Sequence, residues 1–195
     1  MAVANNKTSG RTHAERRELT QQKIIEHGSK LFGKQGFEQT SINQVARAAG
    51  LTEGAIYHHY GNKISLFNAV VEYREMLLTE DLTASDNIKN VDALMSMWDV
   101  FLQACKDPHF VQILLVDAPH VLGRDRWFKT TVLKQLDESL FDSDLIKSMG
   151  LSEEDKTLLF HMLTAAVAEA ALMIAKKPDY DAKPLLKKLL AMITG

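Results

Sequence analysis

The stretch that decides the fold runs from Ile42 to Gly61 and reads INQVARAAGLTEGAIYHHYG. Two short helices that cross tightly need a small residue at the crossing and, at the turn, a residue that tolerates a left-handed backbone. Ala46 and Gly50 stand at those two positions. The apolar residues that can fill the small core between the helices are Val45, Ala49, Leu51 and Ile56. Because all these positions fall in one register, the segment predicts a helix-turn-helix.

Two capping signals delimit the helices of this unit. Ser41 stands three residues before Gln44, which is the spacing of a capping box, and it predicts a helix over residues 42–48. Thr52 can cap a second helix over residues 53–60.

Such a unit places its second helix in the major groove of DNA, while its first helix crosses the phosphate backbone. Gly54 and Ala55 would let the second helix approach the bases closely, and the Ala55 methyl can contact a thymine methyl. Lys63 offers a cation at the start of the next helix. The predicted DNA-binding residues are Ser41, Asn43, Gln44, Thr52, Glu53, Gly54, Ala55, Tyr57, His58, His59 and Lys63. We therefore expect double-stranded DNA as a partner.

The charge is distributed unevenly along the 195 residues, although the net charge is only −2. Residues 1–63 carry 9 Lys and Arg against 5 Glu, whereas residues 64–195 carry 14 Lys and Arg against 20 Asp and Glu. The basic N-terminal part is therefore the candidate for contact with phosphates.

Helical periodicity extends over nearly the whole chain, and no segment alternates like a strand. We predict an all-α protein of about nine helices. The polar residues 1–11 form an N-terminal arm, residues 12–62 the DNA-binding domain, and residues 63–195 a C-terminal domain. Outside the helix-turn-helix, the expected helices span residues 12–34, a long stretch from residue 63, residues 88–105, a segment from Pro108 closed by Pro119 and Gly123, residues 125–141, a stretch from Ser152 to Lys176, and residues 182–193.

The quoted stretch and its surroundings resemble the N-terminal signature of the tetracycline-repressor (TetR) family. The matching residues are Thr40-Ser41-Ile42, Val45-Ala46, Ala49-Gly50-Leu51-Thr52, Gly54-Ala55-Ile56-Tyr57-His58-His59-Tyr60 and Lys63-Ile64-Ser65-Leu66, with Gly36-Phe37 before them. The resemblance covers about residues 14–67, and it departs from the family pattern at His58. It implies a dimeric, all-helical regulator, in most cases a repressor, whose C-terminal domain dimerises and binds a small-molecule effector.

Candidates for the effector site come from aromatic and polar residues after residue 85. Aromatic residues at helical spacing are more often core than pocket, so the pocket itself rests on the resemblance. His161 and Glu169 are polar residues in a nearly all-apolar helix and need a partner, which can be a ligand, a helix neighbour or solvent. The candidate ligand-binding residues are Trp98, Phe101, Cys105, Phe110, Trp127, His161 and Glu169.

The segment 158–175 is apolar almost all round the helix, which indicates burial on more than one side. A core on one side and a second subunit on the other would explain this pattern, although a central helix of a monomer would show it too. The candidate dimer-interface residues are Met162, Ala166, Ala170, Met173, Leu186 and Leu190.

The sequence contains little that indicates a metal site, a cofactor site or a catalytic site. Adjacent helical residues such as His58 and His59 point about 100° apart and cannot chelate one ion together, and Pro108 disturbs the register between Cys105 and His109. We expect no metal site, no cofactor, and a buried, unreactive thiol at Cys105. No spacing typical of an enzyme motif is present.

The apolar runs are interrupted by charges before the roughly 18 residues of a membrane span, and the first thirty residues lack a signal core. We therefore expect a cytoplasmic protein with no membrane partner. The leading hypothesis is a homodimeric repressor that a small molecule releases from a pseudo-palindromic operator. The alternative is a helix-turn-helix regulator without an effector, which is constitutive or controlled by a partner protein.

Overall fold

The structure is a computed structural model, and it describes residues 12–83, 91–123, 126, 134 and 144–194. All regular secondary structure in these ranges is helical, so the all-α prediction is confirmed. The helices are α1 (His13–Gln39), α2 (Ile42–Ala49), α3 (Glu53–Tyr60), α4 (Lys63–Thr83), α5 (Val91–Ala104), α6 (Pro108–Val111), the π-helical turn η1 (Gln112–Asp117), α7 (Ala118–Val121), α10 (Asp144–Lys147), α11 (Glu153–Lys176) and α12 (Lys183–Thr194). The helix expected over residues 125–141 falls almost entirely outside the described residues, and so does Trp127.

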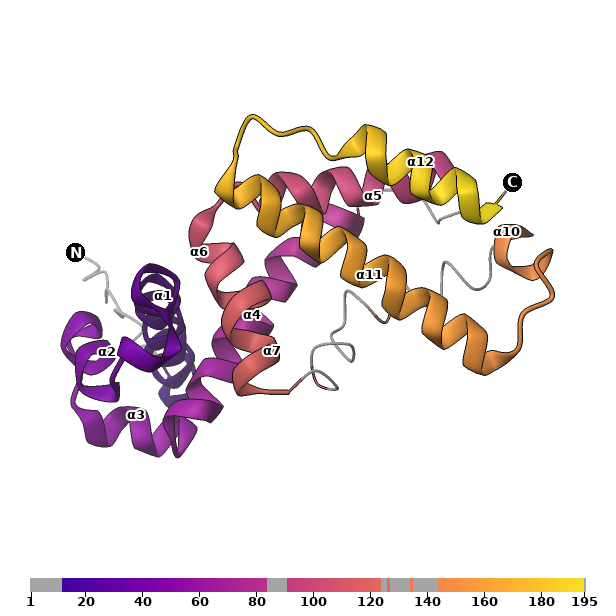
Figure 1. Cartoon of the computed structure of the whole chain (residues 1–195). Coiled ribbons are helices and arrows are strands. Elements are labelled where there is room, and N and C mark those ends of the chain that lie inside the picture. Colours follow the sequence, from indigo (N-terminus) through magenta and orange to yellow (C-terminus); the bar gives the residue numbers. More distant parts are fainter. Residues whose placement is uncertain (1–11, 84–90, 124–125, 127–133, 135–143, 195) are drawn as a thin grey trace, which may run out of the picture.

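The helices form two groups that α4 connects. Figure 1 shows α1, α2 and α3 together at one end, with α5, α11 and α12 at the other. α6 and η1 lie against α1 between the two groups. Buried apolar side chains from Ile24 in α1 to Leu190 in α12 form one continuous cluster, so a single core supports both ends.

Most of the predicted helix starts are confirmed by hydrogen bonds. The Asp107 side chain accepts from the His109 N–H, with Pro108 in the first turn of α6, and the Ser152 hydroxyl accepts from the Asp155 N–H at the start of α11. These side chains satisfy backbone N–H groups that have no partner within their helices.

The predicted helix ends at Gly36 and Gly123 are confirmed, whereas Pro119 does not end a helix. The range of α1 extends to Gln39, but Gly36 has a non-helical backbone with φ of 78° and divides the range into two helices, so the first of them ends where the sequence predicts. Pro119 does not close a helix, because η1 widens the preceding turn. There the Ala118 N–H donates to the Ile113 carbonyl five residues back, and the chain stays helical to Val121.

α11 is long and apolar enough to cross a membrane by length and composition, although the core helix of a soluble protein passes the same test. Phe160, Val167 and Ala171 on one of its sides are buried in the protomer. The apolar character of α11 is therefore explained in part by the core.

Candidate nucleic-acid interface

The crossing of α2 and α3 has the geometry that the sequence predicts. Ala46 lies at the crossing and is only 2% exposed, between the fully buried Val45 and Ile56. Gly50 ends α2 with φ of 67°, and the Leu51 N–H donates to the Ala46 carbonyl at 2.8 Å. The turn is thus tight, and the helix-turn-helix is confirmed.

Aromatic side chains join α1 to α4, the two helices against which this helix pair packs. The Phe32 and Phe67 rings meet edge to face with centroids 5.0 Å apart, and Phe37 approaches Phe67 in the same way at 5.1 Å. All three are buried, so the helix pair rests on a rigid base.

The predicted DNA-binding residues lie at the surface of this unit. Ala55, His59 and Lys63 are half-buried. The others are exposed: Ser41, Asn43, Gln44, Thr52, Glu53, Gly54, Tyr57 and His58. Five of the eleven surround one groove of about 470 Å³, namely Ser41, Asn43, Glu53, Tyr57 and Lys63.

The same groove contains residues that the sequence analysis missed, which are Glu38, Gln39, Thr40, Ile42 and Asn62. Asn62 accepts the Ser65 N–H at 2.8 Å, so it acts at the start of α4 as a capping residue would. An asparagine directly before an expected helix start is a signal that could have identified it. Arg47 on α2 was also missed, and it is an exposed cation on this unit.

Several predicted residues have structural roles within the free protein. Ser41 and Gln44 form the expected capping box, since the Gln44 N–H donates to the Ser41 hydroxyl at 3.2 Å and the Ser41 N–H to Gln44 Oε1 at 2.8 Å. The Thr52 hydroxyl accepts the Ala55 N–H at 3.2 Å. These contacts fix the first turns of α2 and α3.

Lys63 is anchored at the edge of the groove. Its Nζ donates to the Glu38 carbonyl at 3.4 Å and lies 4.1 Å from the centroid of the Phe37 ring. An ammonium group has three donors, so these contacts orient the charge and leave donors for a phosphate.

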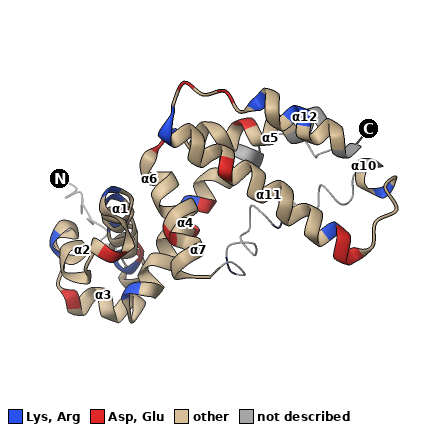
Figure 2. Ribbon diagram, in the orientation of Figure 1, with Lys and Arg blue, Asp and Glu red and all other residues tan. Residues whose placement is uncertain are grey.

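Asn43 links the two helices on the outer face. Its Nδ2 donates to Glu53 Oε1 at 2.5 Å, from the first turn of α2 to the first residue of α3. Glu53 is the first residue of α3, and Figure 2 shows an acidic position beside that helix.

The two adjacent histidines differ in environment. The pKa of His59 is lowered by burial first, then by the nearby charges of His58 and Arg17, and its Nδ1 is buried without a hydrogen-bond partner. The two rings are 5.6 Å apart and inclined by 70°. Among the described residues, no group of three His, Cys, Asp or Glu side chains could hold a metal ion.

The helix-turn-helix is docked on the C-terminal part through successive turns of α1. Arg74 of α4 donates to the buried Ser29 hydroxyl at 2.7 Å and pairs with Asp107 at 3.3 Å. The Phe37 N–H, next to the Gly36 break, donates to Asp117 of η1 at 2.8 Å. We call these contacts, with the close approach of α1 to α6 at Gly33, the α1 seam.

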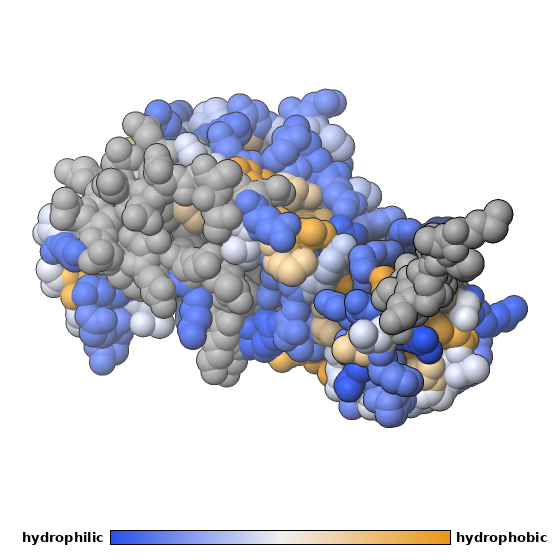
Figure 3. Space-filling view, turned by 180° about the vertical axis from the view of Figure 1, so that it is seen from behind, coloured by the Kyte–Doolittle hydropathy of each residue, from blue (hydrophilic) through white to orange (hydrophobic). Residues whose placement is uncertain are grey.

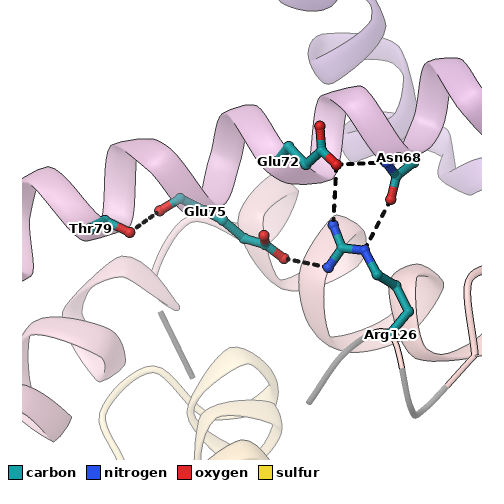
Figure 4. Close-up of polar contacts among 5 residues, drawn as sticks. All are labelled: Asn68, Glu72, Glu75, Thr79 and Arg126. Atoms are coloured by element: carbon teal, nitrogen blue, oxygen red, sulfur yellow. Dashed lines mark hydrogen bonds and ion pairs between the residues drawn. The ribbon is translucent and has the colours of Figure 1, made fainter. Parts of the chain in front are cut away.

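A second polar cluster braces α4. Figure 4 shows Arg126 reaching α4, where its Nε donates to Asn68 at 3.1 Å and its guanidinium pairs with Glu75 at 3.4 Å and Glu72 at 3.7 Å. Burial raises the pKa of Glu75 to about 6, against the opposing effect of Arg126 and with a smaller contribution from Glu72.

The candidate effector residues that the structure describes are in different surroundings. Trp98, Cys105 and Phe110 are buried, and Phe101 packs edge to face on Phe110 with centroids 6.2 Å apart. Burial raises the pKa of the Cys105 thiol to about 12, which agrees with the expected unreactive thiol. On α11, His161 is half-buried, and Glu169 is exposed. Their ligand contacts stay a prediction.

The candidate dimer residues divide into two groups. Met162 and Met173 are exposed, and Ala166 and Ala170 are half-buried. Leu186 and Leu190 are 5% and 1% exposed because α12 turns them into the core of its own protomer. They leave no accessible surface for a second subunit.

Comparisons with known proteins agree with this architecture. A family model described as bacterial regulatory proteins, tetR family, matches residues 24–70, and one described as tetracyclin repressor-like, C-terminal domain, matches residues 91–195. The chain is 27% identical over 180 residues to the HTH-type transcriptional regulator SrpR of Pseudomonas putida, covering 91% of this chain and 73% of SrpR.

Two solved structures share the fold. A TetR-family transcriptional regulator from Pectobacterium atrosepticum has a TM-score of 0.63 and 27% identity, with coverage of 94% of this chain and 95% of that one. NalD, the secondary repressor of the MexAB-OprM multidrug efflux pump in Pseudomonas aeruginosa, has a TM-score of 0.60 and 25% identity, with coverage of 92% and 95%. This chain therefore belongs to the tetR family of bacterial regulatory proteins and is a DNA-binding transcriptional regulator, not an enzyme.

Proposed function

We propose that the protein is a homodimeric repressor that binds a pseudo-palindromic operator and is released by a small-molecule effector. The DNA-binding part of this proposal rests on the exposed first turn of α3, where the small residues Gly54 and Ala55 follow the Thr52 cap. A helix with this opening can enter the major groove closely. Residues 12–62 would form the DNA-binding domain and residues 63–195 the effector and dimerisation domain.

The dimer is supported by the outward side of α11. Its exposed residues recur at helical spacing and form one stripe, namely Leu158, Met162, Ala165, Glu169 and Met173. The opposite side of α11 is buried in the protomer. We propose that this stripe meets its copy across a two-fold axis, with the exposed Leu185 and Met192 of α12 taking the place of Leu186 and Leu190.

A monomer would expose these apolar side chains to water. Figure 3, which shows the molecule from behind, has a surface that is mainly hydrophilic with apolar residues in separate groups. The stripe contains one charged residue, Glu169, but an alignment of the exposed Leu158, Met162 and Met173 on one side of a helix is an uncommon feature of a monomer.

Repression is supported by the likeness to NalD, which is a repressor. Effector release requires that the ligand bind one conformation better than the other. The α1 seam offers the connection, because a shift of α6 or η1 would act directly on α1 and through it on the helix-turn-helix. The effector would contact the predicted residues near Trp98, Phe101 and His161.

Selection of bound sequences from random duplex DNA tests the DNA-binding part of the proposal. We expect a recurring inverted repeat with half-sites about one helical turn apart, because two copies of α3 would enter successive major grooves. Recovery of unrelated sequences would contradict it. A cytoplasmic, nucleoid-associated location follows from the same proposal.

The alternative is a regulator without an effector, and the burial of Trp98, Cys105 and Phe110 favours it. Thermal-shift screening with lipophilic compounds separates the two hypotheses, because a compound that binds the native state raises the unfolding temperature by mass action. A compound that also weakens operator binding would support the effector hypothesis.

A further inference from the structure

Glu53 is an unexpected residue for a surface that faces DNA. It is the only acidic residue between Ser41 and Lys63, it is the first residue of α3, and its side chain is exposed. An ionised carboxylate accepts hydrogen bonds and donates none, and it repels the phosphate backbone. Glu53 is therefore unsuited to a phosphate contact, unlike Lys63 and the uncharged polar residues of the interface.

Asn43 holds this carboxylate in place. The 2.5 Å hydrogen bond from Asn43 Nδ2 to Glu53 Oε1 occupies one carboxylate oxygen and ties the first turn of α3 to the first turn of α2. Among the hydrogen bonds of the described residues, none engages Glu53 Oε2, which leaves that oxygen as an acceptor. The neighbouring Gly54 and Ala55 add little bulk beside it.

The chemistry of the base edges determines what this oxygen can bind. In the major groove, hydrogen-bond donors occur at cytosine N4 and adenine N6. Adenine presents the acceptor N7 beside N6, which would oppose a carboxylate, whereas cytosine has no acceptor beside N4. A carboxylate at the entrance of a reading helix is thus matched to cytosine.

We propose that Glu53, positioned by Asn43, reads the N4 amino group of a cytosine at one base pair of each operator half-site. This inference rests on the proposed placement of α3 in the major groove. A negative charge in the first turn of a helix also stabilises that helix, so a purely structural role for Glu53 is the competing explanation. The two differ in whether sequence preference changes when the charge is removed.

The test compares the wild-type protein with Glu53→Gln, using selection from random duplex DNA and then dissociation constants on four duplexes that differ at one base pair. We expect the wild type to prefer C·G at that position by about tenfold over the other pairs. In Glu53→Gln this preference is lost or moves towards A·T, because a carboxamide can pair with adenine N6 and N7. Binding to unrelated DNA becomes tighter, because one negative charge is gone.

Glu38→Gln is the matched control, since Glu38 is also exposed and lines the same groove. It removes the same charge, so it should tighten binding to all sequences without changing the preferred base pair. Asn43→Ala tests the positioning role. It should lower discrimination at the same base pair as Glu53→Gln does. The variant that combines both substitutions should discriminate no less than Glu53→Gln alone. If Asn43 served only as a phosphate contact, its loss would weaken all sequences equally.

The possible outcomes separate the inference from the proposed function. If Glu53→Gln selects the wild-type site with unchanged ratios, the inference is overturned while α3 keeps its place as the reading helix. If the wild type selects no recurring half-site, the placement of α3 is itself wrong and the inference falls with it.

Discussion

Single residues at the candidate interface combine a structural contact with capacity for DNA. Lys63 shows this most clearly, because the Glu38 carbonyl and the Phe37 ring orient its ammonium group at the edge of the groove. An oriented cation loses less side-chain entropy when it meets a phosphate than a freely rotating one. Lys63 is thus oriented before DNA arrives, at the edge of a groove whose lining also holds the acidic Glu38 and Glu53.

Replacing Lys63 with alanine should weaken binding to every DNA sequence and lower the slope of log K against log salt by about one unit, because one phosphate contact is lost. Titrations at several salt concentrations measure this slope. Lys187→Ala removes an exposed lysine of α12, far from the interface, and should leave the slope unchanged. An unaltered slope for Lys63→Ala would argue against the phosphate contact.

At the scale of elements, α1 and α6 can approach each other closely because Gly33 of α1 has no side chain. A Cβ at Gly33 would lie 2.5 Å from the His109 Cβ, whereas a Cβ at Gly28 would lie 3.2 Å from the Val70 Cγ2 atom. Both glycines are inside α1 and buried, so they share the gain in helix propensity that alanine brings. They differ only in the space available.

Gly33→Ala should therefore lower the free energy of unfolding by about 1–3 kcal/mol through overpacking, since α1 and α6 must move apart. Gly28→Ala is the matched variant and should change stability by less than about 1 kcal/mol. Urea unfolding at constant pH measures both. Equal stabilities would show that α1 and α6 are not in tight contact.

Glu75, a buried residue of α4 that contacts Arg126, makes the stability of the protein depend on pH. The folded protein holds the Glu75 proton more tightly than the unfolded chain, because the pKa rises from 4.5 to about 6 on folding. Between those values the native state binds more protons, so the contribution of Glu75 to stability is present below pH 4.5 and is lost as the pH rises through about 6. The size of this loss is about 2 kcal/mol.

Replacing Glu75 with glutamine should remove this pH-dependent loss of stability. The free energy of unfolding of Glu75→Gln, relative to that of the wild type, should therefore increase between pH 5 and about pH 7. Unfolding midpoints across this range measure the difference. Glu72→Gln provides the control, because Glu72 contacts the same Arg126 from an exposed position. A parallel pH dependence for wild type and Glu75→Gln would contradict the raised pKa.

The sequence predicts those elements whose cause is local. The capping residues Ser41 and Thr52 and the turn at Gly50 act on backbone within a few residues, and each was identified correctly. The continuation of the helix through Pro119 depends on a widened turn, which periodicity does not reveal. The contacts of Asn43 with Glu53 and of Phe37 with Asp117 join residues 10 and 80 positions apart, so no local pattern contains them.

At the scale of the whole molecule, the proposed dimer would bring two helix-turn-helix units together through the exposed stripe on α11. Two half-sites on one face of DNA are bound with higher overall affinity than either alone, because the second contact becomes intramolecular. The operator affinity of the protein should therefore depend on α11, which is remote from α3 in Figure 1.

If the proposed dimer forms, Met162→Lys should convert it to a monomer and reduce affinity for the full operator at least tenfold, because a charge would be buried within the stripe. Analytical ultracentrifugation and operator titrations measure the two effects. Met76→Lys places the same charge at a methionine of α4 with similar exposure, 49% against 59%, and should leave the mass unchanged. If the Met162→Lys protein is still a dimer, the dimer interface must lie outside the stripe on α11.

The bond between Asp117 and the Phe37 N–H uses a group that every residue except proline possesses. The residue at position 37 can therefore be substituted without loss of this hydrogen bond, provided that the Gly36 break and the carboxylate of Asp117 are kept. The other contacts of the α1 seam do depend on side chains, because Arg74 needs the Ser29 hydroxyl and His109 needs the space at Gly33. In a chimera that joins the first part of a relative to residues 63–195, circular dichroism should show a cooperatively folded protein only where the relative supplies glycines that match Gly33 and Gly36.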